Sequence, residues 1–227
     1  MNKYLIILYV IAIVSIAVIQ PAFSQFTITT IFYPINDAWV DVADPEANHG
    51  DDVTLTIGDN QTAYLMFDLG DKWYPVDRIE MVRLRVYVCY NDHPSSNESA
   101  IMINGVSDDS WDENSITWNN KPSYDDPAIT VFSDRSDYWM EVDITEIAKN
   151  VISEEDKLLS LSIRRANHTI LIYSKEETHA NLWPMLVVTY VDPLAESMNT
   201  MMQLFYTLLP LLIILSLANA LIGMIKE

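Results

Sequence analysis

Apolar and polar residues alternate along much of the chain, most clearly between positions 79 and 90. One set of alternate positions there carries Val82, Leu84, Val86, Val88 and Tyr90, and the other set carries Arg83, Arg85 and Tyr87. Because successive side chains of a β-strand point to opposite faces, this pattern predicts an antiparallel strand with one buried face.

Short runs rich in β-branched and aromatic residues predict further strands. They cover residues 26–33, 38–42, 53–57, 63–69, 101–106, 115–118, 128–132, 138–142, 158–164, 169–173 and 185–191. Residues 144–152 instead carry apolar side chains at helical spacing, and Asp143-Ile-Thr-Glu146 has the form of a capping box, which predicts one short helix. Many short strands without long helices between them favour an all-β fold, a jelly-roll β-sandwich with one core.

Residues 1–24 predict a signal peptide. Lys3 precedes an uncharged stretch of 16 residues. As a helix this stretch covers about 24 Å, less than the roughly 30 Å hydrocarbon core of a membrane. Pro21 follows, and Ala22-Phe-Ser24 is a small-x-small triplet that a signal peptidase would cut before Gln25. The alternative is an uncleaved N-terminal anchor, which an intact mass of the exported protein distinguishes from cleavage.

The C-terminal end predicts a transmembrane helix over residues 204–225. No charged residue occurs from position 197 to position 225, and 22 mostly apolar residues are enough to span a membrane. Asp192 and Glu196 precede the segment and Lys226 follows it, so the positive-inside rule places residues 25–191 outside the cell. Residues 192–203 are the predicted linker.

Two residues inside the predicted span suggest that it contacts another helix. Pro210 and Asn219 are tolerated in a membrane where neighbouring groups satisfy the backbone and side-chain polar atoms. Self-association through this helix is therefore one expectation, and a lone single-pass anchor in the cell membrane is the other.

Charge and cysteine content narrow the functional classes. The chain has a net charge of −19, and residues 25–200 hold 31 acidic against 11 basic residues, a net charge of −20. Nucleic-acid binding requires Lys and Arg to neutralise phosphates, so that class is excluded. The single cysteine, Cys89, excludes an intramolecular disulfide framework. Asn60, Asn97 and Asn167 each begin an N-glycosylation sequon, in keeping with export.

Several blocks between residues 30 and 191 occur in a characteristic order. They are Asp37-Ala-Trp-Val, Asn48-His-Gly50, Tyr64-Leu-Met-Phe-Asp68-Leu, Trp111-Asp-Glu113 with Ile116-Thr-Trp-Asn-Asn120 and Pro122, Trp139 with Asp143-Ile-Thr145, and Ser174-Lys-Glu176 with the strand 184–190. This order resembles the DNRLRE, or disaggregatase-related, domain family, whose most specific block is W-x-E-x-x-I-T-W-N-N-x-P.

The resemblance implies a jelly-roll β-sandwich in a secreted or cell-surface protein of bacteria or archaea. Some members of the family resemble carbohydrate-binding modules that hold alginate, so carbohydrate is one expected partner. Alginate carries one carboxylate per sugar, and a domain with a net charge of −20 would repel it. A neutral glycan or a surface protein is therefore the expected ligand.

Loop aromatics are the candidate ligand-binding residues, because they escape the core more often than strand aromatics do. They are Trp73 and Tyr74, which precede Pro75, and Trp183, which precedes Pro184. The alternative is that these rings cover an edge of the sandwich. For the block 111–122 we expect core packing of the tryptophans, with Glu113 and Asn119 or Asn120 bonding nearby backbone, rather than a sugar platform.

Two groups of carboxylates are candidate calcium sites, because Ca²⁺ takes six to eight oxygen ligands that such loops provide. The first is Asp41, Asp44 and Glu46 near Asp51-Asp52, and the second is Asp108, Asp109 and Asp112 with Glu113. The alternative is a solvated acidic surface, since Asp is common in turns.

No catalytic motif stands out, so we expect a protein without enzymatic activity. His49, His93, His168 and His179 lie far apart without zinc-ligand spacing, and no nucleophile elbow or P-loop is present in the sequence. The leading hypothesis is a membrane-anchored surface module that binds carbohydrate or a surface protein. The alternatives are a structural subunit of a cell envelope, filament or virus-like coat, and a polysaccharide hydrolase.

Overall fold

The computed structural model describes residues 26–70, 75–92, 100–152, 157–165 and 168–225. The predicted signal peptide lies outside the described residues, as do Trp73, Tyr74, Asn97 and Asn167. The chain divides into two units. One is Ile28–Tyr190, and the second consists of Met1–Thr27 and Val191–Glu227.

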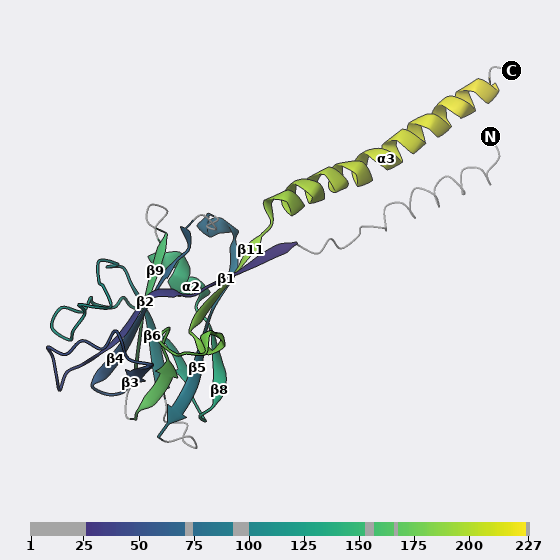
Figure 1. Ribbon diagram of the computed structural model, residues 1–227. Helices are drawn as coiled ribbons and strands as arrows, with labels where there is room; N and C mark the ends of the chain where they lie inside the picture. The colour runs from purple at the N-terminus through teal and green to yellow at the C-terminus, as the bar shows by residue number, and fades with distance from the viewer. Residues whose placement is uncertain (1–25, 71–74, 93–99, 153–156, 166–167, 226–227) are drawn as a thin grey trace. The chain divides into compact units, whose positions relative to one another are not determined.

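Residues 28–190 form a sandwich of two antiparallel sheets (Figure 1). Sheet A contains, in spatial order, β1 (Thr27–Phe32), β11 (Met185–Val191), β5 (Ile79–Asn91), β10 (Ile170–Tyr173) and β3 (Thr54–Ile57), and β8 (Tyr138–Asp143) also pairs with β5. Sheet B contains β2 (Pro34–Asp41), β4 (Gln61–Asp68), β9 (Leu158–Arg165), β6 (Ala100–Val106) and β7 (Ile129–Phe132). The strands β1 to β6 pass alternately between the two sheets, and the predicted all-β sandwich is confirmed.

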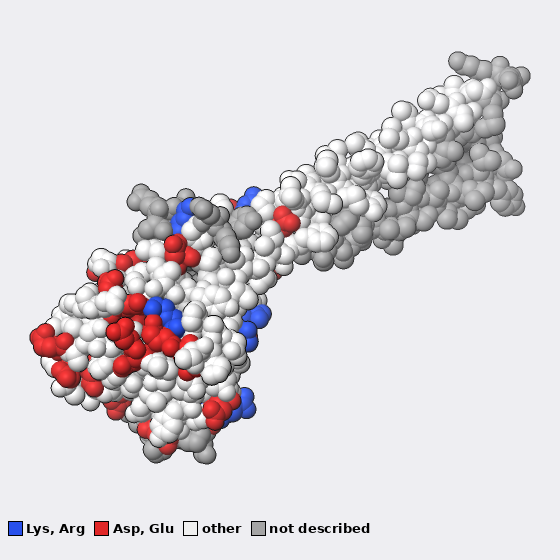
Figure 2. Space-filling model, in the orientation of Figure 1, with Lys and Arg blue, Asp and Glu red and all other residues white. Residues whose placement is uncertain are grey.

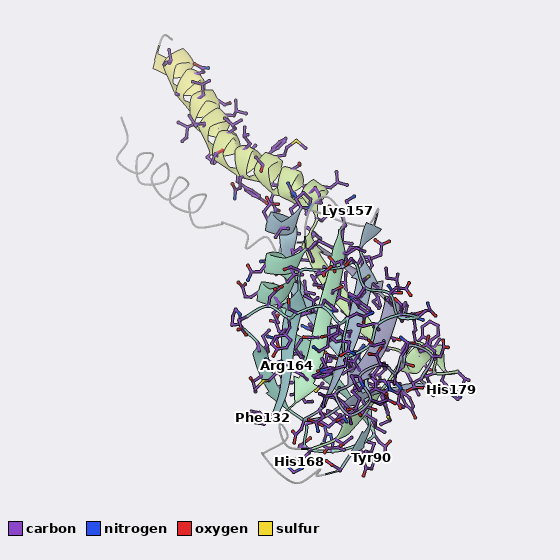
Figure 3. The ribbon with its side chains drawn as sticks, turned by 90° about the vertical axis from the view of Figure 1, so that its left-hand side faces the viewer. Tyr90, Phe132, Lys157, Arg164, His168 and His179 are labelled. Carbon is purple, nitrogen blue, oxygen red and sulfur yellow. The ribbon has the colours of Figure 1, made fainter. Side chains whose placement is uncertain are left out.

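The main core lies between the sheets, where β5 supplies the buried face that its alternation predicts. Val82, Leu84, Val86 and Val88 are all 0% exposed. Tyr90, predicted on the same face, is 49% exposed, so that part of the prediction is wrong. The pairing with β10 shifts register between Leu171 and Ile172, and this bulge reverses the phase of β5. Tyr90 therefore points outward at the end of the sandwich opposite Lys157 (Figure 3).

The outer face of sheet B carries a second, smaller core. The connection between β6 and β7, residues 107–128, folds over it and packs Trp111 and Ile116 against Tyr64 and Met66 of β4. The Trp111 indole donates to Ser160 Oγ at 3.1 Å, and the Tyr64 hydroxyl donates to the Pro122 carbonyl at 3.0 Å. Core packing of this block, rather than a sugar platform, is confirmed for Trp111.

The predicted strand at residues 115–118 is wrong. The backbone there turns instead, because the N–H of Ile116 donates to the Asp112 carbonyl at 2.9 Å and that of Lys121 donates to the Thr117 carbonyl at 3.0 Å. Asn120 holds the same turn, since its Oδ1 accepts from the Thr117 N–H at 2.6 Å and its Nδ2 donates to the Ser115 carbonyl at 2.9 Å. Ile116 of this block packs into the second core instead of pairing in a β-sheet.

The predicted short helix is α2 (Thr145–Val151). Its N-cap is Ile144, and Asp143 Oδ1 accepts hydrogen bonds from both the N–H and the hydroxyl of Thr145 at 3.0 and 2.6 Å, so the helix begins later than the capping box predicts. Gly105 of β6 gives α2 its packing distance. A Cβ at this glycine would lie 2.2 Å from Val151 Cγ2, closer than two carbon atoms can approach.

The remaining helices are the 3₁₀ turns η2 (Val76–Arg78) and η3 (Ala180–Leu182) and the long helix α3 (Pro193–Ile225). The helix α3 has 33 residues, about 50 Å at 1.5 Å per residue, and includes Pro210. It contains the predicted span and also residues 193–203, which we expected as a linker. By length and composition, α3 is the one helix among the described residues that could cross a membrane.

Candidate functional site

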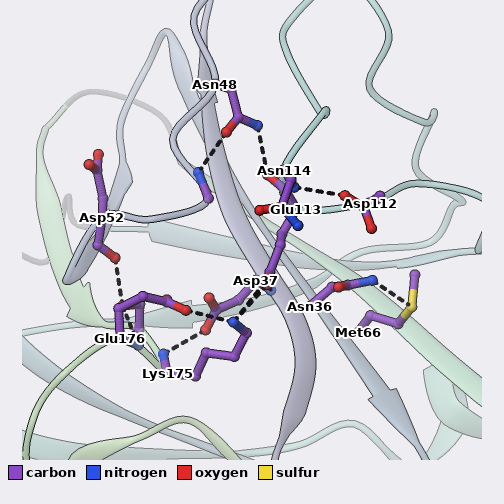
Figure 4. A network of polar contacts seen from close by, with 12 residues as sticks. Asn36, Asp37, Asn48, Asp52, Met66, Asp112, Glu113, Asn114, Lys175 and Glu176 are labelled. Carbon is purple, nitrogen blue, oxygen red and sulfur yellow. Dashed lines mark hydrogen bonds and ion pairs between the residues drawn. The ribbon is translucent and has the colours of Figure 1, made fainter.

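Residues from the separate blocks that carry the family resemblance meet in one charged cluster (Figure 4). The charged cluster consists of Asp37 on β2, Glu113 in the 107–128 connection, and Lys175 and Glu176 just after β10. The Lys175 ammonium lies 2.8 Å from Glu113 Oε2 and 2.6 Å from Glu176 Oε1. The Lys175 N–H donates to Asp37 Oδ2 at 2.8 Å, and the Asp37 N–H donates to Glu113 Oε2 at 3.1 Å.

Burial sets the protonation of this cluster. Asp37 is 0% exposed. Burial and the neighbouring Glu176 charge raise the pKa of Asp37 to about 8, although the hydrogen bond from the Lys175 N–H acts in the opposite direction. For Lys175, burial lowers the pKa of the ammonium, but its hydrogen bonds to Glu113 and Glu176 outweigh this and leave the pKa above its ordinary value. The lysine therefore stays charged, whereas Asp37 holds a proton up to slightly alkaline pH.

A neighbouring loop holds Glu113 in place. The Asn48 side-chain amide donates to the Glu113 carbonyl at 2.6 Å and to the Ile116 carbonyl at 2.8 Å. Gly50 lies so close to this segment that a Cβ would be 2.1 Å from the Glu113 carbonyl oxygen. Ser174 Oγ donates to the Asp52 carbonyl at 2.6 Å, which fixes the other side of the cluster. Asn48 and Ser174 thus hold together the loop after β2, the 107–128 connection and the segment after β10.

The carboxylates of the charged cluster are close enough to share a cation. Ligand oxygens of Asp37, Glu113 and Glu176 all lie within 4.8 Å of one another. The Lys175 ammonium already lies among them and balances part of their charge. We therefore assign to the cluster a structural role, in which the Lys175 ammonium joins the loops.

The first predicted calcium group lies at the end of β2 and in the segment that follows, where the carboxylates of Asp41 and Glu46 bond to protein groups. Asp41 accepts from the Ala43 N–H at 2.8 Å and from the Gln61 side-chain amide at 2.9 Å. Glu46 accepts from the Asn119 amide at 2.6 Å, and the Asp44 carbonyl accepts from the Ala47 N–H at 3.1 Å. Among the described residues, this group does not bring three ligand atoms within 4.8 Å.

The second predicted calcium group lies in the 107–128 connection. Asp108 accepts from both the N–H and the hydroxyl of Ser110, at 3.0 and 2.6 Å, and Asp112 accepts from the Asn114 N–H at 2.9 Å. The hydrogen bonds from Ser110 lower the pKa of Asp108. Asp108 and Asp112 line a small hollow, whereas Asp109 is half-buried. Calcium binding at either group stays a prediction, which melting curves with and without Ca²⁺ test.

Of the predicted ligand aromatics, the described part of the chain contains Trp183. Its indole N–H donates to the Glu177 carbonyl at 2.6 Å, and its ring meets the Tyr33 ring edge-on with 6.1 Å between centroids. The ring is half-buried, so these contacts agree with the alternative that it covers an edge of the sandwich. The predicted glycosylation residue Asn60 is exposed in the turn between β3 and β4.

A row of aromatic rings crosses the outer face of sheet A. Trp139 on β8, Tyr87 on β5 and Tyr173 on β10 are all half-buried. The centroids of Tyr87 and Trp139 lie 5.5 Å apart in an edge-to-face arrangement, and those of Tyr87 and Tyr173 lie 5.7 Å apart with the rings nearly parallel. We call these three residues the aromatic row.

Charged pairs continue the same face beside the aromatic row. The antiparallel register sets Tyr87 opposite Trp139, Arg85 opposite Glu141 and Arg83 opposite Asp143. Arg85 Nε lies 2.8 Å from Glu141 Oε1, and the Arg85 guanidinium lies 5.0 Å from the centre of the Trp139 ring. We call the aromatic row with Arg83, Arg85, Glu141 and Asp143 the sheet A face.

The two outer faces of the sandwich differ in how they are covered. The 107–128 connection covers the outer face of sheet B over β2 and β4, whereas the sheet A face keeps its arginines and Glu141 30–47% exposed. The alternation of β5 already placed Arg83, Arg85 and Tyr87 on one face. The partners on β8 and β10 could not be assigned from sequence, because they depend on strand register.

Among the charged side chains on the visible surface of the sandwich, acidic ones predominate over basic ones (Figure 2). Residues 28–190, the whole sandwich unit, match the model of carbohydrate-binding module family 96. No curated protein matches the chain. The match agrees with the carbohydrate-binding jelly roll implied by the signature blocks, while the name DNRLRE stays a resemblance. Since the match covers well over half of the 227 residues, this chain belongs to carbohydrate-binding module family 96.

Proposed function

We propose that this chain is a membrane-anchored cell-surface protein whose β-sandwich binds carbohydrate through the sheet A face. The observation that carries the proposal is the aromatic row, three adjacent rings from three strands on the outer face of sheet A. The family is one of carbohydrate-binding modules, which are typically non-catalytic, so binding rather than hydrolysis is the expected activity.

The chemistry of the sheet A face suits a sugar chain. Aromatic side chains present a large, rigid apolar surface, against which the C–H face of a sugar ring packs. Arg83, Arg85 and Glu141 lie beside the rings and are 47%, 30% and 43% exposed, so they can exchange hydrogen bonds with sugar hydroxyls. Aromatic side chains beside polar groups that fix the orientation of the ligand are common in ligand sites.

The helix α3 supplies the proposed anchor. Its large apolar side chains are exposed rather than packed into a core, as expected for a helix that lies in lipid. A single pass with the C-terminus in the cytoplasm leaves the sandwich outside the cell. Proteolysis of intact cells tests this topology: the sandwich should be removed from outside, and its protection from protease would contradict the assignment.

Binding is tested with the full chain in detergent micelles against a panel of soluble polysaccharides. Replacing Trp139 or Tyr87 with alanine should weaken binding of the recognised polysaccharide about fivefold, because one stacked ring contributes on the order of 1 kcal/mol. Phe132→Ala is the matched control, since Phe132 is 60% exposed on β7 of the other sheet. Equal losses for all three variants, or no binding by the unmodified chain, would refute the proposal.

A further inference from the structure

We propose that Glu141 makes the sheet A face selective for neutral glycans over acidic ones. The inference rests on the proposed function, and it names the ligand class and the residue that sets it. Its basis is the arrangement of two arginines and two carboxylates beside the aromatic row.

Glu141 bridges both arginines of the face. Its Oε1 lies 2.8 Å from Arg85 Nε, and its Oε2 lies 3.8 Å from Arg83 Nη1. Directly opposite side chains on an antiparallel pair approach closely, so the register itself keeps Glu141 beside Arg85. The single carboxylate therefore occupies one side of both guanidinium groups, where a sugar carboxylate would otherwise bind.

The charges of the sheet A face cancel. Arg83 and Arg85 supply two positive charges, and Glu141 with Asp143, which faces Arg83, supplies two negative charges. Hydrogen bonds from Thr145, and to a lesser degree the charge of Arg83, lower the pKa of Asp143, which keeps it ionised at neutral pH. The surrounding protein, with a net charge of −19, adds a field that opposes an acidic ligand.

The position of Arg85 shows what the face can offer a neutral sugar. Its guanidinium lies over Trp139, 5.0 Å from the ring centre, while Glu141 binds its Nε side and Nη1 lies 3.7 Å from Met185 Sδ. An arginine has five N–H donors and no acceptor, whereas a carboxylate only accepts. Arg85 and Glu141 together therefore present donors next to acceptors, which match hydroxyl groups, since each hydroxyl both donates and accepts.

The test compares Glu141→Gln with the unmodified full chain in micelles, using a neutral β-glucan, a neutral mannan and polygalacturonate as probes. Glutamine keeps the shape of the side chain and removes its charge. We expect the unmodified chain to bind a neutral probe and to bind polygalacturonate weakly. The variant should bind polygalacturonate about fivefold more tightly at low salt, and screening by salt should reduce this gain. Binding of the neutral probe should weaken, because glutamine replaces one acceptor oxygen of the carboxylate with an amide donor.

Two further variants separate local from general charge effects. Glu80→Gln makes the same change in net charge at an exposed position of β5 outside the sheet A face, and should leave the preference unchanged. Arg83→Gln should strengthen the preference for neutral probes. Equal shifts for Glu80→Gln and Glu141→Gln, or a preference of the unmodified chain for polygalacturonate, overturn the inference while the proposed function stands. Failure to bind any carbohydrate overturns both.

Discussion

Lys175 Nζ lies 2.8 Å from Glu113 Oε2 and so ties the end of β10 to the connection that covers sheet B. The same short segment follows Tyr173, the β10 member of the aromatic row. The charged cluster therefore fixes the backbone on which one of the proposed ligand residues stands.

Removing the Lys175 charge should destabilise the sandwich strongly. In Lys175→Met, Glu113 and Glu176 lose their common cation although both side chains are mostly buried. Breaking a fully buried pair costs 3–5 kcal/mol, and partial exposure lowers the expected loss in the free energy of unfolding to about 2–3 kcal/mol. Urea denaturation of the full chain in micelles measures it.

Lys149→Met on α2 is the control for this experiment. Lys149 is half-exposed, and its replacement should change the free energy of unfolding by no more than about 0.5 kcal/mol. If the two lysine variants lost equal stability, the charged cluster would not have the structural role assigned to it.

The protonation of Asp37 should make stability fall as pH rises. Its pKa is raised from 3.8 to about 8 in the folded protein, so the folded state holds a proton that the unfolded state releases above about pH 4. The stability that this proton contributes is complete below pH 4, declines through neutral pH and is lost above about pH 8.

Asp37→Asn isolates this contribution, because asparagine stays neutral at every pH. In metal-free buffer, the unfolding free energy of the variant relative to the unmodified chain should rise between pH 5 and pH 8.5. Urea titrations at the two pH values measure the difference. A difference that does not change with pH would mean that Asp37 is already ionised in the folded protein at pH 5.

Much of the fold was predictable from local patterns. The alternation in β5 gave the correct buried face for Val82, Leu84, Val86 and Val88, because a period of two is a property of the strand itself. Tyr90 was misplaced, since the bulge that turns it outward comes from the pairing with β10. The composition of residues 115–118 predicts a strand, because β-branched residues do not distinguish a sheet strand from a turn that packs on a second core.

The candidate site was less predictable than the fold. Asp37, Glu113, Lys175 and Glu176 belong to separate signature blocks of the sequence, and their convergence depends on loops that only the fold brings together. The aromatic row was missed because Trp139 and Tyr173 belong to short strands whose partners cannot be known before the register is known. Loop position alone favoured Trp183, which the structure shows half-buried beside Tyr33.

Gly50 should tolerate no side chain. A Cβ would lie 2.1 Å from the backbone oxygen of Glu113, and backbone cannot move aside as a flexible side chain can. Gly50→Ala should therefore lower the free energy of unfolding by about 2–4 kcal/mol and loosen the charged cluster. Gly58→Ala is the matched control, because its Cβ would meet the flexible Gln61 side chain at 2.5 Å. Thermal melts of both variants measure the difference, and Gly50→Ala should melt at the lower temperature. Equal melting temperatures would contradict the close approach at Gly50.

Asn219, near the C-terminal end of α3, should promote self-association. Asn219 lies in a stretch of helix whose neighbours are almost all apolar, and an amide in lipid gains about 0.6–2 kcal/mol by bonding to another helix. Asn219→Leu should therefore weaken any dimer of the full chain about three- to thirtyfold in mild detergent, as measured by sedimentation or by energy transfer between labelled copies. Thr207→Leu, also in α3, is the control for a polar residue that bonds within its own helix, because the Thr207 hydroxyl donates to the Gln203 carbonyl at 2.9 Å. A monomeric unmodified chain at high protein-to-detergent ratio would instead identify α3 as a lone anchor, and the sheet A face would then act as a single copy.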